Sequence, residues 1–320
     1  MLWCLLANVL GGTTFVAMDR AAESGLPTIT YTFFRTVLSS LLFLALGAWR
    51  GELRPRFSGR DWGLVLLVAG PGFMLPLVLG VRGVALSTPG IGSILALMEP
   101  IAIVPLSFFF LGERPGRERL IGIGIGLVGA ILVVCSDDLP GASPVDAGAR
   151  VGNVLLAIQG GLWAIYTVAA KPVVERHPAL AVSLWSTVIG CLLLGLLAPL
   201  EWSGLRPRAL DGFAAALGLQ DGVAAGHTVG SAFRAAMPSM IYLGVFGSFL
   251  SVLLWNAGLA GVSAIGMAIF IFVQPAVGLL LNQALGERPP ALFGWIGFGL
   301  ILGAVLLVVR PGSAKARAEA

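Results

Sequence analysis

The chain has little charge. Of its 320 residues, 20 are Lys or Arg and 16 are Asp or Glu, so charged side chains make up 11%. Soluble domains carry about 25% charged residues, and this composition therefore excludes an ordinary soluble globular protein. Hydrophobic residues make up 57%, and the mean hydropathy is +0.94. The composition predicts a protein that lies in a lipid bilayer.

Histidine and cysteine are also scarce. The two histidines, His177 and His227, fall in predicted loops, and the three cysteines, Cys4, Cys135 and Cys191, fall in apolar segments. An odd number of cysteines in such places indicates no disulfide framework and no metal site. No Ser-His-Asp order, HExxH pattern or paired interfacial carboxylates occur. We therefore predict no enzyme activity, no metal and no cofactor.

The net charge of +4 does not indicate a nucleic-acid partner, because the basic residues are scattered over short loops. Residues 124–129 match the G-x-G-x-x-G pattern of dinucleotide-binding proteins. That pattern requires a preceding strand and a following soluble helix, whereas this copy lies inside an apolar run. We predict neither nucleic-acid nor nucleotide binding.

The apolar residues form runs of the length that crosses a bilayer, about 20 residues. The runs are continuous rather than alternating, which favours helices over barrel strands. The sequence predicts an all-α integral membrane protein with ten transmembrane helices at residues 2–18, 28–49, 62–81, 88–111, 118–136, 151–170, 179–200, 237–257, 261–285 and 291–309.

One unit of the chain occurs twice. Leu111-Gly112-Glu113-Arg114 returns as Leu285-Gly286-Glu287-Arg288, and Glu99-Pro100 precedes the first copy as Gln274-Pro275 precedes the second. The predicted repeats cover 1–136 and 151–310, with a linker at 137–150 and a cytoplasmic tail at 311–320. Five spans per repeat is an odd number, so the halves insert in opposite directions, as an inverted repeat.

Lysine and arginine predict the orientation in the membrane. With the N-terminus inside, the inside loops hold twelve basic residues and the short outside loops hold four. Cytoplasmic loops carry such an excess, so we predict that both termini are cytoplasmic. The long connection 201–236 is predicted to hold an interfacial helix at 211–219, with Asp211 as its N-cap.

Two ionisable residues fall well inside predicted spans. Arg35 lies about 10 Å deep and Glu99 about 16 Å deep, at 1.5 Å per residue. Such residues usually face the interior of the bundle and mark a functional site. One interpretation is that Glu99 binds a substrate amine or a coupling proton, while Arg35 holds a substrate carboxylate or tunes Glu99. The other is a structural ion pair, or Glu99 bonding to backbone freed by Pro100.

Polar and aromatic side chains follow helical spacing on several spans, and Pro100 and Pro275 interrupt two of them. A wall of this kind suits an amphipathic organic substrate, and the prolines are either hinges of the cavity wall or ordinary kinks. Trp185 is a weaker candidate for the wall, because it also suits a membrane interface. The predicted cavity set is Arg35, Glu99, Tyr31, Trp163, Tyr166, Asn256 and Gln274.

Small residues recur in the last span of each half. Gly122-x-x-x-Gly126 and Gly299-x-x-x-Gly303 are spaced as in closely packed membrane helices. They predict that these two spans pack tightly, one against the other across the pseudo-axis.

Taken in order, these motifs resemble the drug/metabolite transporter superfamily, in its EamA branch of ten-span permeases. The resemblance rests on Arg35 early in span two, Glu99-Pro100, the repeated Leu-Gly-Glu-Arg, Leu254-Trp255-Asn256 and Gln274-Pro275. It implies an inner-membrane permease, often an exporter of amino acids or other small metabolites, with a central cavity. Ser186 stands where the second half would place an arginine, which departs from the pattern.

We therefore predict a secondary transporter that exports a small, amino acid-like metabolite by alternating access. Its predicted partners are the substrate, coupling protons and the lipid bilayer, and a monomer is preferred. The alternatives are a transporter of drugs or nucleotide sugars, a membrane-embedded enzyme and a passive channel. A nucleotide sugar calls for several cavity cations, an enzyme for clustered acids or histidines, and a channel for a ring of charges.

Overall fold

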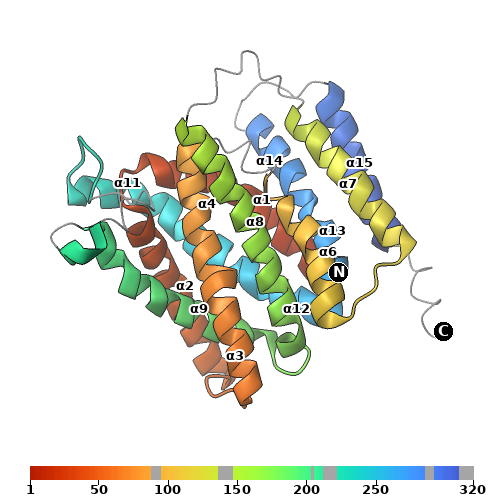
Figure 1. Ribbon diagram of the computed structural model, residues 1–320, viewed down its shortest axis with the longest axis horizontal. Helices are drawn as coiled ribbons and strands as arrows, with labels where there is room; N and C mark the ends of the chain where they lie inside the picture. The colour runs from red at the N-terminus through yellow and green to blue at the C-terminus, as the bar shows by residue number, and fades with distance from the viewer. Residues whose placement is uncertain (88–94, 136–146, 203–204, 212–221, 285–291, 310–320) are drawn as a thin grey trace.

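The structure is a computed structural model, and it describes the chain except for residues 88–94, 136–146, 203–204, 212–221, 285–291 and 310–320. The described residues form helices and connecting loops, without a strand among them (Figure 1). The first half contains α1 (Leu2–Glu23), α2 (Thr28–Arg50), α3 (Gly59–Leu67), the π-helical η1 (Val68–Met74), α4 (Leu75–Leu86), α6 (Met98–Leu111) and α7 (Arg117–Cys135).

The second half repeats this order of elements. It contains α8 (Ala147–Val174), α9 (Ala179–Leu197), the short helices η2 (Ala198–Glu201) and η3 (Arg208–Leu210), α11 (Val229–Tyr242), the π-helical η4 (Leu243–Leu250), α12 (Ser251–Gly261), α13 (Ala264–Ile271), α14 (Val273–Ala284) and α15 (Leu292–Val309). A π-helical turn therefore interrupts the third rod of each half.

Six helical segments in the described residues are long and apolar enough to cross a membrane. They are Leu2–Glu23, Thr28–Arg50, Gly59–Leu86, Arg150–Val174, Ala179–Glu201 and Val229–Gly261, and shorter apolar helices cover Met98–Leu111, Ala264–Gly278 and Trp295–Ala304.

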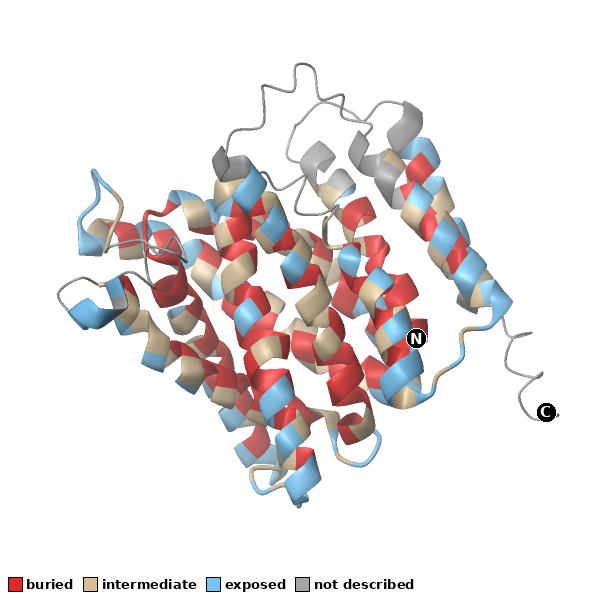
Figure 2. Ribbon diagram, in the orientation of Figure 1, coloured by how far each residue is buried: buried red, intermediate tan, exposed pale blue. Residues whose placement is uncertain are grey.

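The outer surface is apolar. Trp49, Phe109 and Leu196 are each at least 75% exposed, and exposed positions follow the outer faces of the helices (Figure 2). Large apolar side chains on an outer surface are costly in water and favourable in lipid. Together with the apolar helices, they identify an integral membrane protein.

Hydrogen bonds assign the helix termini to two ends of the molecule. At the first, the Asp61 end, Arg176 and His177 contact the Asp61 carboxylate. At the second, the Glu201 end, the Glu201 carboxylate accepts the backbone N–H groups of Ile29 and Thr30, each at 2.7 Å, and caps the start of α2. The α1–α2 turn lies at the Glu201 end and the α8–α9 turn at the Asp61 end, so α1 and α8 run in opposite directions.

The helices of the two halves pack in matched pairs. α1 packs on α12 and α14, and α8 packs on α4 and α6. α2 packs on α9, and α7 on α15. Exchanging each element for its counterpart in the other half leaves this set of pairs unchanged.

The small-residue motif predicts the right pair of helices, but the glycines of its second copy do not lie in the contact. α7 does pack along α15, yet Gly299 and Gly303 are exposed, and a Cβ atom at either would meet no atom within 4 Å. A Cβ atom on Gly129 would instead lie 2.8 Å from the Gly297 carbonyl oxygen. The spacing of glycines does not reveal which face of a helix turns toward its partner.

Four predicted spans are too short. The span predicted at 62–81 is a rod from Gly59 to Leu86. α1 continues past residue 18 to Glu23, α8 begins at Ala147 rather than 151, and the rod that contains α12 begins at Val229 rather than 237. Polar and charged residues at these termini continue the helical backbone beyond the apolar run. The interfacial helix predicted at 211–219 lies, apart from Asp211, outside the described residues.

Candidate functional site

A cavity of about 100 Å³ lies at the centre of the bundle and is lined by both halves. Its wall includes five predicted cavity residues, Arg35, Glu99, Trp163, Tyr166 and Gln274. Ligand sites for drug-sized molecules typically measure about 300–1,000 Å³. In this conformation the cavity therefore accommodates only a small molecule, and a larger substrate requires the helices to move.

Two of the three side-chain nitrogens of Arg35 have a hydrogen-bond partner. Its side chain is 1% exposed, and Nε and Nη2 donate to the Ser248 hydroxyl on η4 at 3.2 and 2.9 Å. The third nitrogen, Nη1, is buried without a hydrogen-bond partner. A buried guanidinium normally has a partner for each of its nitrogens, so this site has an unused donor beside the cavity.

Glu99 lies on another wall of the cavity, in the first turn of α6. It is 7% exposed, and it follows an interruption of the helix at Ala96 and Leu97. The Thr167 hydroxyl on α8 faces the carboxylate without meeting the geometry of a hydrogen bond. In the described part of the chain, no ion pair joins Glu99 to Arg35.

A close helix crossing positions Glu99. A Cβ atom on Gly160 of α8 would lie 2.9 Å from the Leu95 carbonyl oxygen and 3.2 Å from the Glu99 backbone nitrogen. Real Cβ atoms do not approach backbone oxygen so closely, so glycine permits this contact.

The second half contains a similar crossing at Gln274. A Cβ atom on Gly12 of α1 would lie 2.7 Å from the Gln274 carbonyl oxygen, and the Gln274 amide donates to Asn8 Oδ1 at 2.9 Å. The helix is interrupted at Phe272, just before Gln274-Pro275. Each proline therefore follows a break in the helix that carries the cavity residue.

The aromatic part of the wall is held by hydrogen bonds behind it. Trp163 and Tyr166 lie edge to face with ring centroids 5.7 Å apart. Asn256 donates to the Tyr166 hydroxyl at 2.7 Å and to the Ser183 hydroxyl at 2.8 Å. Asn256 is thus placed behind the lining rather than in it.

Tyr31, like Asn256, lies outside the lining, and its hydroxyl donates to Ser239 at 3.0 Å. Trp185 also falls outside it and packs against Trp62 with centroids 5.6 Å apart. Sequence reasoning missed Trp255 of α12, which lines the cavity. Its place beside the predicted cavity residue Asn256, in Leu254-Trp255-Asn256, is a signal that could have found it.

Glu113 lies outside the cavity and has structural partners. Glu113 accepts the backbone N–H groups of Ala264 and Ile265 at 2.9 and 3.1 Å, which caps α13. Within the described residues, no group of three or more His, Cys, Asp or Glu side chains could hold a metal ion.

Comparison with known proteins identifies the family. The model of the EamA-like transporter family matches residues 1–135 and 150–310. The chain belongs to the EamA-like transporter family. Its members are membrane transporters, and this fits the apolar helices, the lipid-facing surface and the central cavity described above. Family and relatives therefore point to a transporter of small molecules rather than an enzyme.

Two relatives and one solved structure are similar to this EamA-like transporter over most of its length. It is 25% identical over 309 residues to a probable terminal-alkyne amino-acid exporter of Streptantibioticus cattleyicolor, covering 96% of this chain and 93% of the relative. It is 24% identical over 306 residues to the uncharacterized inner membrane transporter YedA of Escherichia coli K12, covering 94% and 87%. A crystal structure with 20% identity and a TM-score of 0.68 covers 98% of this chain and 99% of its own, and shows the fold alone.

Proposed function

We propose that this EamA-like transporter is a secondary exporter of a small, amino acid-like metabolite, and that it works by alternating access. The observation that carries this proposal is a central cavity lined by a buried arginine with an unused donor, Arg35, and a buried carboxylate, Glu99. The similarity to a probable amino-acid exporter supports it as well.

The two charged residues receive separate roles. Arg35 Nη1 binds the substrate carboxylate, because an anion removes the cost of a buried donor without a partner. Glu99 binds the substrate amine or a coupling proton, because it lies in the same cavity and no ion pair with Arg35 neutralises it. A nucleotide sugar fits less well, since Arg35 is the one cationic side chain in the described lining.

The proposed architecture is ten spans in two inverted repeats, with the cavity at their interface. The opposite directions of α1 and α8 support this arrangement. The helix breaks before Pro100 and Pro275 are the proposed hinges. Each break lies beside a residue of the cavity lining, Glu99 or Gln274.

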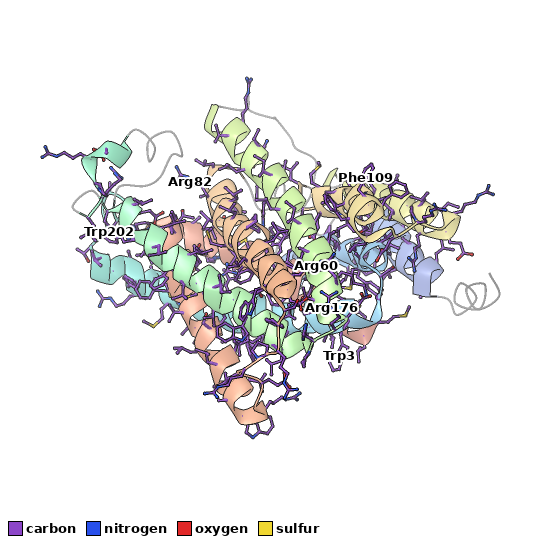
Figure 3. All side chains as sticks on the ribbon, turned by 60° about the horizontal axis from the view of Figure 1, so that its bottom comes forward. Trp3, Arg60, Arg82, Phe109, Arg176 and Trp202 are labelled. Atoms are coloured by element: carbon purple, nitrogen blue, oxygen red, sulfur yellow. The ribbon has the colours of Figure 1, made fainter. Side chains whose placement is uncertain are left out.

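The proposed location is the inner membrane, with the Asp61 end and both termini in the cytoplasm. The Asp61 end carries many of the arginines, including Arg54, Arg56 and Arg114 in loops and Arg60 in the first turn of α3. Figure 3 turns this end forward and shows Arg60 and Arg176 there.

The proposal is tested by transport in proteoliposomes. Purified protein with an imposed pH gradient is assayed for uptake of labelled amino acids, with Glu99→Gln compared against Glu201→Gln. Glu201 is also buried, but it caps α2 and lies outside the cavity. We expect Glu99→Gln to abolish the effect of the gradient while Glu201→Gln keeps it. If Glu99→Gln keeps the full dependence on the gradient, the proton-coupling role of Glu99 is wrong. If the wild type transports no amino acid, the proposed substrate class is wrong.

A further inference from the structure

A second donor lies in the cavity wall and is not used within the protein. Trp255 lines the cavity, and its indole Nε1 is buried without a hydrogen-bond partner. An indole N–H can only donate, so only a group with a lone pair can satisfy it. A buried donor without a partner is costly, and a bound molecule that accepts its hydrogen bond would recover that cost.

The position of Trp255 relative to Arg35 determines what that molecule must offer. Ser248, which holds Arg35, and Trp255 are seven residues apart on the η4–α12 rod. At 1.5 Å per residue they are about 10 Å apart along the helix axis. Ser251 and Val252 line the cavity between them. The two donors therefore suit two separate acceptors on one molecule better than the two oxygens of a single carboxylate.

We infer that Trp255 is a specificity-determining residue: its indole N–H binds an oxygen on the side chain of the substrate while Arg35 binds the carboxylate. This inference rests on the proposed function, and it adds a subclass of substrate. The transporter prefers amino acids with an oxygen in the side chain over apolar amino acids of the same shape. Sites built to bond a substrate hydroxyl or amide reject the analogue that lacks it, because their polar groups are then left unpaired.

The chain contains a matched control. Trp185 of α9 is also an indole whose Nε1 is buried without a partner, but it packs against Trp62 and does not line the cavity. Replacing either tryptophan by phenylalanine removes the N–H and keeps an aromatic ring. Only the change at Trp255 should alter discrimination between substrates.

The experiment measures binding of three amino-acid pairs of matched shape to purified full-length protein: threonine with valine, asparagine with leucine, and tyrosine with phenylalanine. We expect the wild type to bind the oxygen-bearing member of at least one pair about tenfold more tightly. In Trp255→Phe this ratio should fall to about one, with the affinity for the apolar member retained. In Trp185→Phe the ratio should stay at the wild-type value.

The outcomes separate the inference from the proposed function. If the wild type binds both members of every pair equally, or if Trp255→Phe keeps the preference, amino-acid binding stands and the role of Trp255 is wrong. The same holds if Trp185→Phe loses the preference equally. If the wild type binds none of the six amino acids, the proposed substrate class fails and the inference fails with it.

Discussion

At the scale of single residues, the buried arginine is the most unusual feature of the protein. Arg35 is 1% exposed and has one partner side chain, Ser248. A buried charge is costly unless it is fully paired, and a fold that needed only stability would place an apolar residue there. Arg35 therefore opposes stability in the empty transporter, as residues kept for binding often do.

Two substitutions at this contact should change stability in opposite directions. Arg35→Met removes the buried charge and should raise the melting temperature in detergent, while binding of an amino acid falls at least tenfold. Ser248→Ala removes the partner of Nε and Nη2 and should lower the melting temperature, because the charge stays buried without compensation. Thermal unfolding with and without the amino acid measures both effects. A large loss of stability in Arg35→Met would instead identify Arg35 as a structural residue.

The sequence predicts the charged members of the cavity better than its uncharged ones. Arg35 and Glu99 stand out because charges inside apolar runs are rare, and both lie in the lining. Trp255 does not stand out, because tryptophan occurs at many positions in membrane helices. Only the packing of its neighbours reveals that its N–H lacks a partner.

At the scale of helices, close crossings hold the cavity residues in place. Gly160 brings α8 against the start of α6 at Glu99, and Gly12 brings α1 against the start of α14 at Gln274. Both contacts occur beside a break in the helical backbone. The polar residue of each broken helix is therefore fixed by a neighbouring helix from another part of the chain.

Neighbouring glycines on α8 provide a test of this crossing. Gly160→Val forces α8 away from α6 and should lower the melting temperature by several degrees, since overpacking costs about 1–3 kcal/mol. Amino-acid binding should fall as well, because Glu99 moves. Gly161→Val is the control, since a Cβ atom at Gly161 would meet nothing within 4 Å. Equal melting temperatures for the two variants would contradict the importance of the crossing.

At the scale of the whole molecule, the symmetry of packing is clearer than the symmetry of sequence. The paired contacts of α1 with α12 and of α8 with α4, and the π-helical turns η1 and η4, recur in both halves. The polar residues do not recur so closely, since Arg35 in one half corresponds to Ser186 in the other. The repeated helices therefore form the framework, and the difference between Arg35 and Ser186 gives the cavity a cationic side.

Cysteine labelling in cells tests the inverted arrangement. In a variant without Cys4, Cys135 and Cys191, single cysteines replace Arg56 at the Asp61 end and Ala225 at the Glu201 end. These positions follow corresponding spans of the two halves. A membrane-impermeant maleimide should label Ala225→Cys in intact cells, and Arg56→Cys only in inverted vesicles. Labelling of both from the same side would contradict the inversion.

The sequence by itself determines that this protein lies in lipid, that it is helical and that one unit occurs twice. Composition and the length of apolar runs fix the first two properties, and the repeated motifs fix the third, because each is read directly from the order of residues in the chain. The tertiary structure alone decides which residues share the cavity and which of their polar atoms lack partners. Arg35, Glu99 and Trp255 come from α2, α6 and α12, and their surroundings depend on helix crossings between distant segments that no local pattern records.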